Sequence, residues 1–495
     1  MEEFKEYLEK TGEIGRVVAI SNFIARVSGL PNLKLNEMVI SEGGETGIVF
    51  GLEKEGAEIL TFGKNLKVGE TIVRTDRIFQ IPASENLLGR VINPLLKPID
   101  ELGPITGEKK YLEIYREAPG MIQRKRVKRP LDTGVMIVDL LIPIGYGQRE
   151  LIIGDAKTGK TTFILQTIVN QVREGTICIY VAIGKETSAV KFVEDYLKEE
   201  GVFENTIMVV AFGKDPSTLN YLAPFSGMTV AEYFRDKEKN VLIVFDDLTT
   251  HAKFYREISL SAKRLPGRSC YPGDIFHIQA ALLERAGNIE GKYGEVSITA
   301  LPVGETLEND ISGYIQTNLI GMTDGHIFFD SEEFRKGKRP AINAFLSVSR
   351  VGNQTKNQIE KELAQLIRKN LVEYQRAQAV TQFGVELSPR TRKILEIGRK
   401  IEILFEQDPK TLIPYPLRVF LFGLLFFGFF DGKPENLTRL EKEEIIKRYK
   451  KGGLKELDEI KRLKNFEELK IFVEKIIPKV REILHRSREI LHRSV

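Results

Sequence analysis

The sequence contains little cysteine. Cys178 and Cys270 are its two cysteines, and they lie far apart in a chain of 495 residues. Neither a disulfide framework nor a zinc site with paired cysteines can be built from them, and a reducing compartment suits such a chain best. These residues therefore exclude a fold that depends on cross-links.

The sequence also lacks a long apolar run and a recognisable leader. Its most apolar window, residues 419–430, is shorter than the about 20 residues that span a bilayer, so we predict a buried helix there. The first ten residues, MEEFKEYLEK, are acidic and poor in apolar side chains. They resemble neither a secretory signal nor a transit peptide, and we expect the protein to work where it is made.

The length exceeds what a single hydrophobic core usually supports, and the pattern changes twice along the chain. Residues 1–85 contain short alternating runs between turns, which predict an antiparallel β-barrel. Residues 86–353 alternate apolar strands with helical stretches, which predict an α/β domain with a mostly parallel sheet. Residues 354–495 have helical spacing and predict an α-helical bundle.

A phosphate-binding loop is the clearest motif. Residues 154–161 match G-x-x-x-x-G-K-[ST] between a strand-like run and a helical segment, the context that distinguishes a P-loop (RecA-like) domain from a chance glycine turn. The backbone amides and Lys160 are expected to hold phosphates, and the Thr161 hydroxyl a Mg²⁺ ion. The predicted ATP/ADP contacts here are Gly154, Asp155, Ala156, Lys157, Thr158, Gly159, Lys160, Thr161 and Thr162.

A carboxylate at the end of another buried strand is expected to complete the Mg²⁺ site. The run VLIVFDD at residues 241–247 provides it. Because successive side chains of a strand face opposite sides, only one of its two aspartates can point at the metal, and we predict Asp246. It would contact the ion through water.

Longer motifs give a resemblance to a family. The stretches that carry it are residues 131–134 and 142–155, FDDL at 245–248, LPGRSCYPGDIF at 265–276, LLERAG at 282–287, SITALPVGET at 297–306 and RPAINAFLSVSRVG at 339–352. With them the sequence resembles the alpha subunits of F-type (rotary) ATP synthases, from about residue 12 to 420. The resemblance implies a β-barrel, a nucleotide-binding domain and a helical bundle.

The resemblance implies a subunit that binds MgATP without hydrolysing it. Catalytic subunits of this family carry a glutamate that orients the attacking water at the end of the strand after the P-loop helix. The matching residue here is Lys185. A protonated lysine has no lone pair with which to accept a proton, so we expect the isolated chain to be inactive. Family alpha subunits usually have glutamine there, and neighbouring Glu186 would point to the other strand face.

The resemblance also implies roles for residues that match functional positions of the family. Arg350 matches the arginine that reaches the γ-phosphate in the neighbouring catalytic site, and Ser347 would shape the same strand end. The alternative is a structural arginine in an ion pair. The residues expected at the adenine end of this subunit's own nucleotide are Phe334, Arg339, Pro340 and Gln407. Pro409 replaces a second family glutamine, and Ala156 and Lys157 replace a more usual Arg-Gln.

The implied partners are catalytic beta-type subunits in an alternating hexamer of three and three, a central rotor shaft and a peripheral stalk subunit contacted through the N-terminus. That contact is expected to be shortened, because about ten residues precede the first predicted strand. We expect no nucleic acid. Membrane association would run through the partners, on the cytoplasmic face of a bacterial plasma membrane or, for an organelle-encoded chain, on an inner or thylakoid membrane.

Two alternatives remain at this point. An autonomous hexameric ATPase, such as a secretion motor or a transcription-termination helicase, would need a carboxylate at position 185, and a helicase also a basic, aromatic nucleic-acid groove. A pure assembly component with a vestigial nucleotide site is disfavoured by the intact Gly159, Lys160, Thr161 and Asp246. The expected activity is that of an H⁺-transporting ATP synthase, to which this chain contributes one subunit type.

Overall fold

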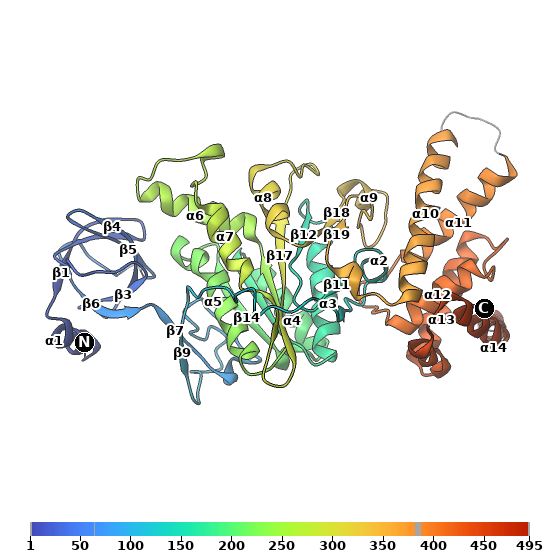
Figure 1. Ribbon diagram of the computed structural model, residues 1–495, viewed down its shortest axis with the longest axis horizontal. Coiled ribbons are helices and arrows are strands. Elements are labelled where there is room, and N and C mark those ends of the chain that lie inside the picture. Colours follow the sequence, from blue (N-terminus) through green and yellow to red (C-terminus); the bar gives the residue numbers. More distant parts are fainter. Residues whose placement is uncertain (1, 64, 382–387, 494–495) are drawn as a thin grey trace. The chain divides into compact units, whose positions relative to one another are not determined.

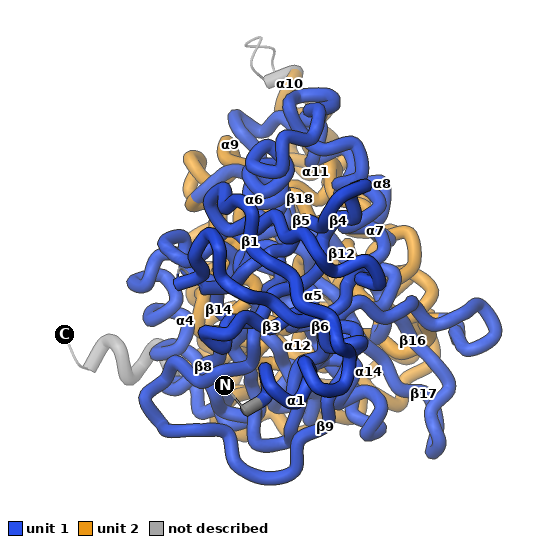
Figure 2. The backbone as a smooth tube through the Cα atoms, turned by 90° about the vertical axis from the view of Figure 1, so that its left-hand side faces the viewer, with its two compact units in different colours: residues 1–126, 146–156, 171–326 blue, residues 127–145, 157–170, 327–495 orange. Residues whose placement is uncertain are grey.

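The computed structural model describes residues 2–63, 65–381 and 388–493, and the chain divides into two compact units. The first unit comprises residues 1–126, 146–156 and 171–326, and the second comprises residues 127–145, 157–170 and 327–495 (Figure 2). Each unit is therefore assembled from segments that are distant in the sequence. The domain boundaries predicted at residues 85 and 353 stay predictions.

The first unit begins with helix α1 (Glu2–Thr11), which is followed by a closed six-stranded antiparallel barrel with the spatial order β1-β2-β5-β4-β3-β6 (Figure 1). Apolar side chains from alternate positions, such as Val27, Val39 and Ile59, fill its interior. The predicted barrel is confirmed. Its strands are β1 (Ile14–Ser21), β2 (Ile24–Ser28), β3 (Glu37–Ser41), β4 (Thr46–Glu53), β5 (Gly56–Thr61) and β6 (Thr71–Ile78).

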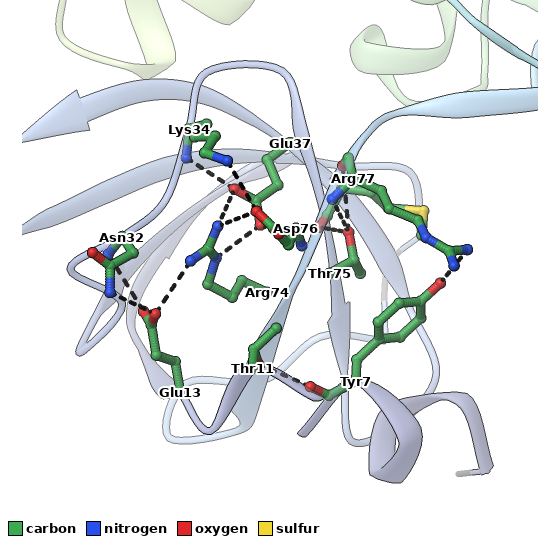
Figure 3. Close-up of polar contacts among 11 residues, drawn as sticks. Tyr7, Thr11, Glu13, Asn32, Lys34, Glu37, Arg74, Thr75, Asp76 and Arg77 are labelled. Atoms are coloured by element: carbon green, nitrogen blue, oxygen red, sulfur yellow. Dashed lines mark hydrogen bonds and ion pairs between the residues drawn. The ribbon is translucent and has the colours of Figure 1, made fainter. Parts of the chain in front are cut away.

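A buried arginine joins three parts of the barrel. The guanidinium of Arg74, on β6, donates to Glu37 Oε1 at 2.9 Å, to Glu13 Oε1 at 3.2 Å and to Asp76 Oδ1 at 2.9 Å (Figure 3). Glu13 also accepts a hydrogen bond from the amide side chain of Asn32 at 2.7 Å. The network therefore ties the start of β1 and the start of β3 to β6.

Helix α1 packs against the outside of this barrel. Its Phe4 and Tyr7 are buried in a cluster with Ile40 of β3 and Val73 of β6. The hydroxyl of Tyr7 accepts a hydrogen bond from Arg77 at 3.2 Å (Figure 3). The apolar face of α1 is therefore occupied by the barrel.

The rest of the first unit is built around a parallel sheet with the order β12-β17-β15-β13-β14-β8, and one antiparallel strand, β16, pairs with β17. The strands are largely buried on both faces, which explains their nearly continuous apolar sequences. A small ribbon, β7 (Gln80–Ala83) with β9 (Lys110–Glu113), lies apart from it. The strands of the sheet are β8 (Val91–Ile92), β12 (Glu150–Gly154), β13 (Ile177–Lys185), β14 (Thr206–Phe212), β15 (Val241–Asp246), β16 (Gly287–Glu290) and β17 (Glu295–Glu305).

Helices cross between these strands, as the sequence predicts. Helix α5 packs on β13, β14 and β15, and α6 packs on α5 and β17. The helices are α4 (Thr187–Glu199), α5 (Ser217–Arg235), α6 (Leu248–Ser261), α7 (Ile275–Glu284) and α8 (Tyr314–Met322), with 3₁₀ turns at Glu85–Leu87, Phe203–Asn205 and Arg268–Cys270. Helix α3 (Lys160–Arg173) belongs to the second unit up to residue 170 and to the first unit from residue 171.

The second unit is mainly helical. Helix α12 contains residues 419–426 of the most apolar window and is buried along nearly its whole length, which confirms a buried helix for that part of the window. In the part of the chain that the structure describes, no helix combines the length and apolarity needed to span a membrane. The helices are α2 (Met136–Leu141), α9 (Ser331–Arg335), α10 (Gln358–Thr381), α11 (Pro389–Phe405), α12 (Tyr415–Phe426), α13 (Glu435–Lys450) and α14 (Phe466–Arg493), with 3₁₀ turns at Gly352–Thr355 and Lys455–Arg462.

Short strands complete this unit. They pair locally, β10 with β11, and β18 with β19. The strands are β10 (Pro130–Leu131), β11 (Ile144–Gly145), β18 (Gly325–Phe329), whose last three residues belong to the second unit, and β19 (Val348–Ser349).

A fully buried arginine lies at the centre of the second unit. Arg418 of α12 bonds to Asp132 at 2.8 Å, to Asp139 at 3.3 Å and to Glu360 of α10 at 2.9 Å. Its side chain is 2 % exposed. Burial raises the pKa of Asp139 to about 7 against the opposing effect of Arg418, so this carboxyl depends on its cationic partner to remain ionised.

Replacing this arginine is expected to destabilise the helical unit strongly. Arg418→Met would leave three carboxyl groups without their cation, and loss of one partner of a buried ion pair costs about 3–5 kcal/mol. The matched control is Arg439→Met, because Arg439 pairs with Glu406 at the surface, where such pairs contribute about 1 kcal/mol or less. Urea unfolding followed by circular dichroism measures the free energy of unfolding of both variants. Equal losses of stability in the two variants would contradict the stabilising role assigned to Arg418.

His251 makes the first unit sensitive to acid. It is buried on α6, its Nε2 lies 3.1 Å from the carbonyl oxygen of Tyr221, and Gln279 Nε2 lies 3.4 Å from its Nδ1. Burial lowers the pKa of His251 to about 4, so the neutral ring is the folded form.

The stability contributed by neutral His251 is present above the unfolded pKa of about 6.5 and is lost as the pH falls toward 4, by up to about 3 kcal/mol. We expect the melting temperature of the wild type to fall more between pH 7 and pH 5 than that of His251→Gln. The difference between the two proteins should therefore narrow with acid. A constant difference in thermal melts would show that His251 does not titrate in this way.

Candidate functional site

The P-loop has the backbone that phosphate binding requires. It connects β12, which ends at Gly154, to α3, which begins at Lys160. Lys157 and Gly159 have positive φ angles of 62° and 102°, and at 102° a side chain would strain the loop. The amides and the helix dipole at the start of α3 favour an anion at this end. Thr158 is buried, whereas Ala156, Lys157 and Thr162 are exposed.

Asp155 fixes the start of this loop. Its carboxylate accepts hydrogen bonds from the Thr306 hydroxyl at 2.6 Å and from the backbone N–H of Asn309 at 2.9 Å. Thr306 follows β17 directly, and Asn309 lies in the loop after it. They did not emerge from the sequence as site residues, although Thr306 closes the family stretch at 297–306.

The carboxyl edge of the sheet places Asp246 near the start of the P-loop. β15 ends at Asp246 and β12 at Gly154, and only β17 lies between these parallel strands. The carboxyl group of Asp246 is almost buried, and the Tyr180 hydroxyl donates to its Oδ2 at 2.5 Å. A buried, oriented carboxylate therefore stands where the sequence predicts it.

The oxygen donors suit Mg²⁺, which prefers carboxylate, hydroxyl and phosphate oxygens. Among the described residues no group of three or more His, Cys, Asp or Glu side chains is arranged to hold a metal. A Mg²⁺ ion bound here would therefore take most of its ligands from phosphates and water, and Asp246 is the candidate protein group in the first unit.

Lys185 occupies the position expected for a catalytic base. It is the last residue of β13, and its Nζ lies 2.7 Å from Asp246 Oδ1 and 3.5 Å from Asp247 Oδ2. Burial opposes its charge, but the two carboxylates outweigh burial and raise the pKa of Lys185. The residue is therefore an ammonium ion at neutral pH and has no lone pair for a proton.

The direction of the Asp247 side chain differs from the sequence prediction. The alternation of strand side chains predicts that it faces away from Asp246, yet both carboxylates approach Lys185. The reason is that β15 ends at Asp246, and Asp247 is the N-cap of α6, accepting hydrogen bonds from Thr250 N at 2.6 Å and Thr250 Oγ1 at 3.0 Å. Burial raises the pKa of Asp247, and Lys185 opposes this.

Glu186 is exposed at the N-cap of α4. The hydroxyl of Ser188 donates a hydrogen bond to its Oε2 at 3.5 Å. Because β13 ends at Lys185, Glu186 lies beyond the strand rather than on its opposite face.

The residues predicted for the adenine end are brought together in the second unit. The Arg339 guanidinium carbon lies 3.5 Å from the centroid of the Phe334 ring, and the backbone N–H of Gln407 donates to the Arg339 carbonyl at 2.8 Å. Pro340 follows Arg339 in the chain. A cavity of about 820 Å³ is lined in part by Arg339, Gln407 and Pro409.

The side-chain amide of Gln407 holds the wall of this cavity. Its Oε1 accepts a hydrogen bond from Met136 N at 3.0 Å, and its Nε2 donates to the carbonyls of Gly134 and Thr411, each at 2.6 Å. Both ends of the amide thus bond to backbone. This positioning function was not foreseen from the sequence.

Arg350 directly follows β19, and its side chain is exposed. Two serines anchor the backbone before it. The Ser347 hydroxyl donates to Asn343 O at 2.6 Å and accepts from Phe328 N at 2.9 Å, and the Ser349 hydroxyl donates to Pro143 O at 2.6 Å. The arginine therefore extends from a fixed strand end.

The predicted site residues are divided between the two units. Gly154, Asp155, Ala156 and Asp246 belong to the first unit, together with Lys185. The second unit contains Lys157, Thr158, Gly159, Lys160, Thr161, Thr162, Phe334, Arg339, Pro340, Gln407, Ser347 and Arg350.

Comparison with known proteins agrees with this arrangement. Residues 134–349 match the ATP synthase alpha/beta family, nucleotide-binding domain, and residues 354–479 match the ATP synthase alpha/beta chain, C terminal domain. The chain is 41% identical over 480 residues to ATP synthase subunit alpha of Aquifex aeolicus (strain VF5), and the alignment covers 95% of each chain. The chain therefore belongs to the ATP synthase alpha/beta family, among the alpha subunits of F-type ATP synthases.

Proposed function

We propose that this chain is a non-catalytic subunit of the rotary ATP synthase that binds MgATP and completes the catalytic site of the adjacent catalytic subunit. The observation that carries the proposal is the ammonium of Lys185 in the place of the base, 2.7 Å from Asp246. Hydrolysis needs a group that orients and polarises water, and a cation paired with a carboxylate does neither. The isolated chain should therefore retain nucleotide and not turn it over.

The proposed nucleotide site uses the P-loop for the phosphates and the Phe334, Arg339, Pro340 and Gln407 group for the adenine end. Lys160 supplies a full positive charge, and the amides that open α3 supply hydrogen bonds. Thr161 and Asp246 are the residues that would hold Mg²⁺, which when bound neutralises part of the phosphate charge. The cavity beside Gln407 supports a base-binding role for that region.

The proposed catalytic contribution is Arg350, acting on the γ-phosphate bound by the neighbouring subunit. Its guanidinium stays charged, and such an arginine accelerates phosphoryl transfer by about 10³–10⁵. The exposure of Arg350 and the hydrogen bonds of Ser347 and Ser349 support this assignment, because they present a cation outward from an anchored strand end.

The proposed partners are catalytic beta-type subunits, the rotor shaft and a peripheral stalk subunit, with the membrane reached through these partners on the cytoplasmic face of a bacterial plasma membrane. Because the apolar face of α1 is buried on the barrel, a stalk contact there would use its exposed polar side chains, which include Lys5, Glu6 and Lys10.

An autonomous ATPase motor is the second candidate. It would require a working base, and Glu186 is the nearest carboxylate in sequence. Its exposure beyond the end of β13 argues against that role.

The nucleotide site can be tested on the isolated chain. Lys160→Gln is expected to weaken MgATP binding about 10- to 100-fold, because it removes a charge-assisted bond to phosphate. Lys191→Gln is the matched control, since Lys191 is an exposed lysine of α4 paired with Asp195. Isothermal titration calorimetry measures the affinities. Equal effects of the two substitutions would place the nucleotide elsewhere.

The trans-acting arginine can be tested in the reconstituted complex. Arg350→Ala is expected to lower the turnover of ATP by about 10³-fold or more while the complex still assembles. Arg335→Ala, another exposed arginine of the same unit, should leave turnover within about twofold of the wild type. Steady-state ATPase assays with gel filtration of each complex decide this. Normal turnover by Arg350→Ala, or hydrolysis by the isolated chain, would overturn the proposal.

A further inference from the structure

The ammonium of Lys185 lies between two carboxylates at the carboxyl edge of the sheet. Its Nζ is 2.7 Å from Asp246 and 3.5 Å from Asp247. The second oxygen of Asp246 accepts the Tyr180 hydroxyl, and Asp247 caps α6. Both carboxylates thus already have ion-pair or hydrogen-bond partners within the chain.

The direction of the Lys185 side chain determines how close its ammonium lies to the start of the P-loop. The strand order β12-β17-β15-β13 places Asp246 two strands, or about 10 Å, from the end of β12, and Lys185 three strands away. The Lys185 side chain reaches across from β13 to the carboxylate on β15, which is the strand nearer to the P-loop. The ammonium is therefore displaced toward the edge at which the loop begins.

The charge at this point depends on residue 185. With both carboxyl groups ionised, Lys185, Asp246 and Asp247 carry one net negative charge, whereas a glutamine at 185 would leave two. A concentrated negative charge repels the polyphosphate of ATP through a partly buried region, where screening by salt is weak. A divalent cation can relieve that repulsion, and so can an ammonium ion.

We infer that Lys185 takes over part of the role of the divalent cation, so that this chain binds ATP with an unusually small dependence on Mg²⁺. The inference rests on the nucleotide site proposed above. Two effects lower the dependence of ATP binding on Mg²⁺. The ammonium reduces the electrostatic repulsion between the carboxylates and metal-free ATP. The ion pair between Lys185 and Asp246 must also be broken or shared before Mg²⁺ can bind that carboxylate, which weakens the contribution of the metal.

The experiment compares the affinity of the full chain for ATP in excess Mg²⁺ and in EDTA. For each protein it gives the ratio of the dissociation constant in EDTA to that in Mg²⁺. Lys185→Gln is expected to raise this ratio about tenfold or more, mainly by weakening binding in EDTA. Lys185→Arg keeps the charge and should keep the ratio within about threefold of the wild type.

Glu186→Gln is the matched control, because it changes one charge at the neighbouring exposed residue and should not change the ratio. A second variant, Asp246→Asn, should have the opposite effect from Lys185→Gln. It should tighten the binding of ATP in EDTA, since it removes a negative charge and leaves Lys185 in place. Circular dichroism verifies that each variant is folded, and the Asp246→Asn result stands even if Lys185→Gln does not fold.

Equal ratios for the wild type and Lys185→Gln, or weaker binding of ATP in EDTA by Asp246→Asn, would overturn the inference while leaving the nucleotide site intact. Absence of ATP binding by the wild type in both solutions would instead contradict the nucleotide site itself, and the inference with it. The two failures are therefore distinguishable in one set of titrations.

Discussion

Parallel pairing of the central strands is the constraint on which the functional arrangement depends. It brings the carboxyl ends of β12, β13 and β15 to one edge of the sheet, so residues from three distant parts of the sequence meet there. The buried strands fix the backbone at that edge, and the side chain at each strand end sets the charge there. The chemistry is therefore decided by single residues such as Lys185, while the fold stays the same.

Buried arginines hold segments that are distant in the sequence together elsewhere in the chain. Arg74 joins strands of the barrel, and Arg285 bonds to Glu232 of α5 at 2.8 Å and to the Ile114 carbonyl at 2.8 Å. Arg418 gathers three carboxylates in the helical unit. Buried ion pairs are weak evidence of net stability, but each of these requires segments distant in sequence to meet in one geometry. Each contact therefore fixes the relative position of the segments that it joins.

Local patterns predicted the elements well. Helix α3 follows the P-loop where the sequence places a helical segment, and Lys185 and Asp246 stand at strand ends as expected. These features follow from periodicity over a few residues, which the sequence displays directly.

Interactions between elements could not be predicted in the same way. The pairing of Lys185 with Asp246 depends on β13 lying beside β15, although β14 intervenes in the chain. The approach of Asp247 depends on where the strand ends, and alternation alone gave the wrong direction. The bonds from Gln407 to Gly134 and from Thr306 to Asp155 cross long stretches of sequence. Such contacts are set by tertiary packing, which no local pattern records.

The residue at position 185 determines both whether a catalytic base stands at this edge and whether Asp246 and Asp247 need a bound cation. A carboxylate at position 185 would stand beside Asp246 and Asp247, and three carboxyl groups so close together remain ionised only when a cation joins them. A catalytic base there therefore depends on a metal ion that stays in place. In this chain the cation beside Asp246 and Asp247 is the side chain at position 185 itself, so the two carboxylates have a positive partner without a metal ion.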